Sequence, residues 1–229
     1  MPEQLPHHSF LTLAQTHPDR PALRNERTAL TAGELARQAL QTATVLAERG
    51  IGRGDAVGVS ISDPVRCIPA VLGILTTGAR CVPLAEGLPA RRQEGLLCNN
   101  GVRILLTDHP QARTPTTSDP TPQNSSAPYD VAPTWRIAQL PLALAESAEP
   151  LRLAPARRTG RVAWVYPSNN RRAGAAHLLT HRDVARAADH LTSKDNRPRQ
   201  VRLLIPSHSP LWPYAVFPAL AQGIPLQGD

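Results

Sequence analysis

The segment after a predicted strand at 162–166 concentrates side chains that could bind an anion. It reads Tyr166-Pro167-Ser168-Asn169-Asn170-Arg171-Arg172-Ala173-Gly174-Ala175-Ala176-His177. The adjacent guanidinium groups of Arg171 and Arg172 could hold a phosphate or a carboxylate through bidentate hydrogen bonds. The alternative interpretation is that these polar residues are ordinary loop surface.

Histidines and cysteines are the other residue types that could bind a metal or take part in chemistry. His177 and His181 are four residues apart, a spacing that suits a metal pair when both lie on one helix. The predicted helix begins only near Thr180 and no carboxylate accompanies the pair, so we expect no metal. The cysteines, Cys67, Cys81 and Cys98, lack paired spacing and have apolar neighbours. We expect small buried side chains rather than a disulfide or a zinc site.

Alternating helix and strand signals precede the Arg171 segment. Thr31 and Glu34 form a capping box that predicts a helix ending at Gly50, and Asp63-Pro64 predicts a second helix ending at Gly78. Further elements are strands at 56–61, 81–84 and 102–107 and a helix opening at Pro89. Strands that alternate with helices of this length are typical of an α/β fold with a mostly parallel sheet.

The rest of the chain divides into a linker and a second block. Residues 109–134 are rich in Pro, Ser and Thr, which indicates a flexible tether. In 135–229 we expect strands at 162–166 and 201–205, helices at 180–191 and 214–221, and the start of a strand at Ile224. We therefore predict a first α/β subdomain at 1–108 and an incomplete second one at 135–229. Two strands do not make a stable sheet, so either the first block or another polypeptide must complete it.

Composition and charge limit the classes of partner that we expect for this chain. The formal net charge is +7, but the arginines are scattered and Lys194 is the only lysine. A nucleic-acid-binding surface usually needs a concentrated basic face, so we expect no nucleic-acid partner. No apolar run approaches the ~20 residues that cross a bilayer. The polar start of the sequence carries no signal-peptide pattern, and we expect a cytoplasmic protein without a membrane partner.

Five short segments stand in order over the first half of the chain: HPDRPAL at 17–23, LTAGEL at 30–35, GIGRGDAV at 50–57, LTTGARCVPL at 75–84 and PARR at 89–92. Together they resemble motifs of the adenylate-forming (AMP-binding) superfamily: acyl-CoA synthetases, luciferases and the adenylation domains of nonribosomal peptide synthetases. Ala32 stands where the family usually has tyrosine. The resemblance implies the N-terminal region of the adenylate-forming fold.

The segment at 166–177 aligns with the family's phosphate-binding loop, Y-T-S-G-[ST]-T-G-x-P-K-G-V. That loop needs glycines so that backbone N–H groups can close on the ATP phosphates, and it needs a lysine charge. Here Asn169, Arg172 and Ala176 occupy the glycine positions and Ala175 the lysine position. The degenerate loop positions are Tyr166, Ser168, Asn169, Asn170, Arg171, Arg172, Gly174 and Ala175. Two interpretations compete: a relic loop that no longer binds phosphate, and a loop in which Arg171 and Arg172 replace the lost lysine. We favour the relic, and we expect ATP and Mg as ligands only if the loop still binds phosphate.

His208 lies in Ile205-Pro206-Ser207-His208-Ser209, which resembles the family's strand-end P-x-x-H segment. The resemblance implies a residue that faces the acyl or amino-acid pocket; a capping or hydrogen-bonded loop histidine is the alternative. The family's adenine and ribose motifs and its catalytic lysine are expected beyond this point, so we assign no catalytic residue.

Three functions follow from the resemblance. The first is a degenerate, non-catalytic module that docks beside acyl- or aminoacyl-activating machinery. The second is one half of a split ATP-dependent ligase, and the third is a small-molecule or anion binder that retains the pocket around His208. In each of the first two a second protein chain is the expected partner.

Overall fold

The computed structural model describes residues 5–108, 138–141, 143, 149, 162–166, 177–191 and 198–228. In chain order the elements are α1 (Pro6–Thr16), β1 (Pro21–Arg24), β2 (Ala29–Thr31), α2 (Ala32–Glu48), β3 (Ala56–Ser60), α3 (Pro64–Thr77), β4 (Arg80–Pro83), α4 (Ala90–Asn99), β5 (Val102–Thr107), β6 (Ala138–Pro141), β7 (Val162–Tyr166), β8 (His177–Thr180), α6 (His181–Leu191), β9 (Val201–Arg202), α7 (Trp212–Ala221) and β10 (Leu226–Gln227).

Local capping signals fix the helix starts where the sequence predicts them. The Thr31 side chain accepts from the Glu34 N–H at 3.2 Å, and a Glu34 carboxylate oxygen accepts from the Thr31 N–H at 2.8 Å. Asp63 caps α3 through the Val65 N–H, and Gly78 ends that helix with φ of 82°. At α6, Asp183 accepts from the Thr180 N–H at 2.9 Å. These caps are worth about 1 kcal/mol each.

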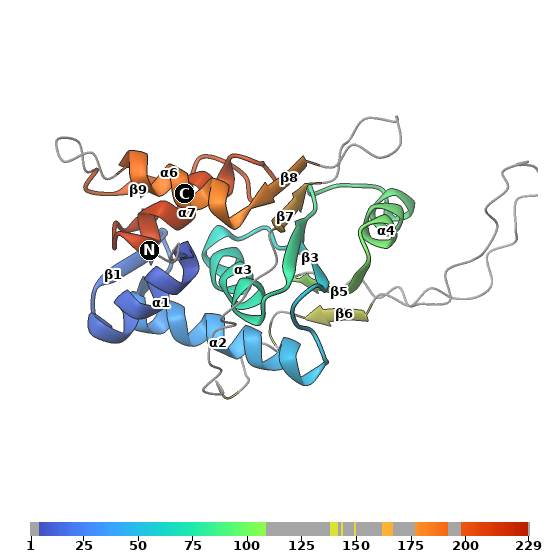
Figure 1. The fold of residues 1–229 in the computed structure, drawn as a ribbon, viewed down its shortest axis with the longest axis horizontal. Helices are drawn as coiled ribbons and strands as arrows, with labels where there is room; N and C mark the ends of the chain where they lie inside the picture. The colour runs from blue at the N-terminus through green and yellow to red at the C-terminus, as the bar shows by residue number, and fades with distance from the viewer. Residues whose placement is uncertain are drawn as a thin grey trace, which may run out of the picture.

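A six-stranded sheet in the order β6-β5-β3-β4-β7-β8 forms the centre of the molecule. Neighbouring strands run parallel except β8, which pairs antiparallel with β7. In Figure 1, α2 and α3 lie together on one side of the sheet and α4 lies apart from them. Two separate apolar clusters match this arrangement: the large one includes α3, and the small one packs Leu97 of α4 against β3, β4 and β5.

A second, four-stranded sheet joins the two ends of the described chain in the order β2-β1-β10-β9. Leu23 of β1 pairs with Leu226 of β10, and Leu226 pairs with Val201 of β9. Both sheets therefore contain strands from 1–108 and from 135–229, so the first block completes the sheets of the second. The predicted subdomain boundaries stay a prediction, and the predicted linker at 109–134 lies outside the described residues.

The structure corrects several sequence predictions. β9 covers two residues rather than 201–205, because its last sheet bond runs from the Leu203 N–H to the Gln227 carbonyl and Pro206 follows. α7 begins at Trp212, two residues before the predicted start. The sequence patterns predict none of the elements α1, β1, β2, β6 and β8. None of the described helices has the length and apolar character needed to span a membrane.

Candidate functional site

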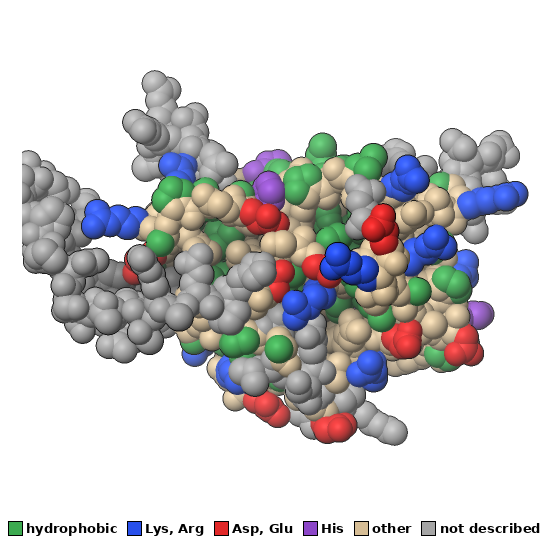
Figure 2. All heavy atoms as spheres, turned by 180° about the vertical axis from the view of Figure 1, so that it is seen from behind, with side chains coloured by type: hydrophobic (Ala, Val, Ile, Leu, Met, Phe, Trp, Pro, Cys, Tyr) green, Lys and Arg blue, Asp and Glu red, His purple; other side chains and the backbone are tan. Residues whose placement is uncertain are grey.

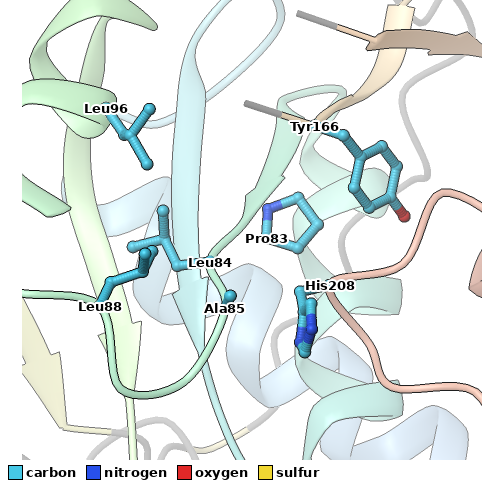
Figure 3. A pocket seen from close by; sticks show the side chains of 7 residues that line it. All are labelled: Pro83, Leu84, Ala85, Leu88, Leu96, Tyr166 and His208. Carbon is cyan, nitrogen blue, oxygen red and sulfur yellow. The ribbon is translucent and has the colours of Figure 1, made fainter. Parts of the chain in front are cut away.

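The candidate site is a small hollow at the carboxyl ends of β4 and β7. Pro83, Leu84 and Ala85 form one wall, while Tyr166 and His208 contribute the polar groups. Figure 3 shows Tyr166 to the right of the Pro83 ring and His208 below it, with Leu84, Leu88 and Leu96 on the left. Because β4 and β7 run parallel, both present their carboxyl ends here, the edge at which open α/β sheets bind ligands.

Tyr166 is the one position of the predicted phosphate loop that the structure describes. Its ring is buried, and its hydroxyl has no hydrogen-bond partner within the described part of the chain. Burial raises the pKa of Tyr166 far above its ordinary value, with Cys81 and Cys67 adding to the effect. The group is therefore a neutral phenol that can donate or accept one hydrogen bond.

His208 sits in the turn between β9 and α7 and is half-buried. The turn is held by the Ser209 N–H, which donates to the Pro206 carbonyl at 2.9 Å. The structure thus brings His208 and Tyr166 to one hollow. The hollow has a volume of about 50 Å³, and polar groups of Tyr166 and His208 line it beside apolar side chains, which suits a water molecule or a small chemical group.

The remaining predicted loop positions lie outside the described residues: Ser168, Asn169, Asn170, Arg171, Arg172, Gly174 and Ala175. Both flanks are described. Tyr166 at the end of β7 pairs with His177 at the start of β8, so the loop is closed at its base like a hairpin. The predicted phosphate loop therefore falls in a connection whose two ends are paired in the sheet.

The two histidines considered as a metal pair have different environments. His177 is exposed at the start of β8, whereas His181 is 5% exposed. No group of three potential ligand side chains suited to a metal ion occurs among the described residues. The cysteines are free thiols, with Cys67 and Cys81 buried and Cys98 only partly so. Burial raises the pKa of Cys67 to about 12, so this thiol is a poor nucleophile.

Sequence reasoning missed a cluster of buried imidazoles. His7 of α1 lies with its ring centroid 4.4 Å from that of His8 and 5.2 Å from that of His181. Trp164 of β7 lies 6.0 Å from His181 by the same measure. Burial lowers the pKa of His181 to about 4 and lowers that of His7 as well, with the neighbouring histidines adding to the effect. The cluster is neutral at physiological pH and joins α1 to the large core.

The sequence profile of the AMP-binding enzyme family matches residues 10–153. Surfactin synthase subunit 1 of Bacillus subtilis (strain 168) is 38% identical over 100 residues, which are 44% of this chain and 3% of that protein. Pyochelin synthetase PchE of Pseudomonas aeruginosa is 39% identical over 111 residues, 48% of this chain and 8% of that protein. The chain belongs to the AMP-binding enzyme family and matches only a small part of these much longer relatives.

Solved structures extend the similarity to the whole chain. The nonribosomal peptide synthetase FmoA3, in a form with AMPPNP bound, superposes with a TM-score of 0.77 at 28% identity, over 99% of this chain and 23% of that one. The N-terminal subdomain of Klebsiella oxytoca NpsA superposes with a TM-score of 0.76 at 21% identity, over 97% of this chain and 52% of that one. The chain therefore has the α/β fold of the N-terminal subdomain of adenylation domains, and it is an adenylation-domain fragment related to nonribosomal peptide synthetases.

Proposed function

We propose that this chain is a non-catalytic adenylation-like module that acts as a structural or docking element beside machinery handling carrier-bound acyl or aminoacyl groups. The observation that carries the proposal is the composition of the β7–β8 connection. Side chains replace the glycines at 169, 172 and 176, and Ala175 replaces the lysine. Each Cβ there obstructs the approach of backbone N–H groups to phosphate, and the loss of the lysine removes a point charge.

The hollow at the base of this connection supports the proposal. Its volume is about 50 Å³, whereas pockets for ligands larger than a few atoms start near ~300 Å³. The Tyr166 ring and the Pro83 ring both line it (Figure 3). A nucleotide cannot enter without displacement of these side chains.

Exposed leucines support a docking role. Leu178 on β8 is 54% exposed, Leu204 just beyond β9 is 69% exposed and Leu211 at the start of α7 is 61% exposed. Figure 2 shows hydrophobic side chains along the upper margin of the molecule, the side on which β8, α6 and α7 lie in Figure 1. Among the described strands, β8 and β9 are also the edges of their sheets, where backbone groups can pair with another strand.

The docking role is tested by co-purification with the product of a neighbouring reading frame that carries a carrier or condensation domain. We expect a complex whose affinity falls about tenfold or more in the Leu178→Lys, Leu211→Lys double variant, because apolar contact area is lost and charge is buried. Gln15→Lys, which adds a charge at an exposed position of α1, is the matched control. Unchanged affinity in the leucine variant would contradict a docking role for this surface. A neighbouring frame that carries the family's nucleotide motifs and restores adenylation would favour the split ligase.

If the loop no longer binds nucleotide, replacement of Arg171 and Arg172 should have no effect on ATP affinity. Arg171→Ala with Arg172→Ala is expected to leave ATP affinity at the same negligible level as in the native chain, since the guanidinium groups do not replace the lost glycines. The ATP affinity of both chains is measured from the displacement of a bound fluorescent ATP analogue by ATP. A measurable native affinity that drops in the variant would show that the arginines bind phosphate, and the relic interpretation would then be wrong.

A further inference from the structure

A second hollow, of about 290 Å³, opens at the carboxyl ends of β3 and β5 beside β6. Its position follows from the sheet topology. β3 continues through α3 to β4 on one side, and the chain then returns through α4 to β5 on the other side of β3. Connections that leave neighbouring parallel strands in opposite directions create a crevice at the carboxyl edge, which is where open α/β sheets hold their ligands.

The lining is polar over a small apolar floor. Leu105 and Thr107 are two residues apart and therefore share one face of β5, the face on which Leu105 packs in the small apolar cluster with Leu97 of α4. Ser60 at the end of β3 lines the same hollow, and two carboxamides, Gln93 of α4 and Gln139 of β6, complete a set of hydrogen-bonding groups. This set can both donate to and accept from hydroxyl groups.

The charge that the described residues bring to the hollow has one sign. Both ionisable side chains that the structure places in its lining, Glu86 and Asp108, are carboxylates. Asp108 is held in place because its Oδ2 accepts from the Ser62 N–H at 2.9 Å. We propose that this hollow binds a small organic ammonium ion that carries hydroxyl groups. The carboxylates attract the ammonium group, and the carboxamides and hydroxyls of the wall pair with the ligand hydroxyls.

The hollow is distinct from the one beside Tyr166. The loop between β4 and α4 separates them: Ala85 and Leu88 line the first, whereas Glu86 and Gly87 line the second. Gly87 has φ of 71°, a left-handed conformation that turns the loop between the two sides. An anionic nucleotide would meet carboxylates in the second hollow, so its ligand does not depend on whether the degenerate loop binds ATP.

The test uses two probes of nearly the same size and shape, in phosphate buffer at neutral pH. Protonated tris(hydroxymethyl)aminomethane carries an ammonium group and three hydroxyls, while pentaerythritol is its neutral counterpart. Titrations on the isotope-labelled chain follow the amide resonances of Ser62, Gly87 and Asp108. We expect saturable shifts with the ammonium probe at millimolar concentrations and about tenfold weaker binding of pentaerythritol.

Variants that remove the carboxylate charges but keep the size of the side chains test whether charge determines the preference for the ammonium probe. Asp108→Asn keeps an oxygen for the Ser62 N–H, and together with Glu86→Gln it is expected to abolish the preference for the ammonium probe while the affinity for pentaerythritol stays the same. Glu94→Gln, at an exposed position of α4 outside the lining, should retain the preference. Equal affinities for the two probes in the native chain, a preference that survives in the double variant, or no saturable shift at tens of millimolar would each overturn the proposal.

Discussion

Replacement of Gly73 by alanine is expected to lower the free energy of unfolding by about 2 kcal/mol, although alanine is the better helix former. Gly73 lies in α3 where α2 crosses it. A Cβ there would come within 2.6 Å of the Ala39 carbonyl oxygen and within 2.6 Å of the Thr42 Cβ. A backbone oxygen cannot yield like the end of a flexible side chain, so the two helices would have to separate.

Gly95→Ala is the matched control because Gly95 also lies in a helix, α4, with nothing within 4 Å of the added Cβ. There the same change is expected to raise stability by up to about 1 kcal/mol. Urea unfolding followed by circular dichroism measures both variants. Opposite signs support the close α2–α3 contact, and a neutral or stabilising Gly73→Ala would contradict it.

Acidification is expected to destabilise the chain through the buried histidines. The pKa of His181 falls from 6.5 to about 4 on burial, so the unfolded chain takes up a proton at a higher pH than the folded chain does. Stability is therefore complete above pH 6.5 and is lost progressively as the pH falls toward 4. His181 alone accounts for about 3 kcal/mol over that range, and His7, whose pKa is also lowered, adds to the loss.

The measurement is the difference in unfolding free energy between pH 7 and pH 4.5 within each variant, so that any offset from the substitution itself cancels. His181→Leu is expected to reduce that difference by about 2 kcal/mol, because pH 4.5 lies above the pKa of His181 in the folded chain and only part of the loss is complete there. Asp183 does not account for a loss of stability between pH 7 and pH 4.5, because its hydrogen bonds with Thr180 hold its pKa below 3.8. An acid sensitivity that is the same in His181→Leu and the native chain would contradict the proposed cause.

Local signals predicted the elements around the α3 side of the sheet well. The Thr31 and Glu34 capping box, the Asp63-Pro64 start and the Gly78 stop each act within a few residues, so the sequence alone identifies α2 and α3. The resemblance to the adenylate-forming family is confirmed by the family profile over residues 10–153 and by the fold over nearly the whole chain.

What the sequence could not predict depends on contacts between distant segments. Strands are expected at 201–205 and from Ile224, but β9 and β10 have two residues each, too few for an alternating pattern to predict their bounds or the pairing of Leu23 of β1 with Leu226. The His7 and His181 contact joins α1 to α6 across most of the chain, and nothing near either residue signals it. His208 was found through a motif, but the second hollow needed the strand order, since its lining comes from β3, β5, β6 and the α4 region.

The central claim, that the nucleotide site is lost, is tested most directly by titration calorimetry of ATP with Mg into the purified chain. The account predicts no heat of binding from a folded, monodisperse sample, with or without a panel of carboxylic acid and amino-acid substrates. Binding at micromolar concentrations would contradict it, would show that the side chains at 169, 172 and 176 leave room for phosphate, and would make one half of a split ligase the better interpretation.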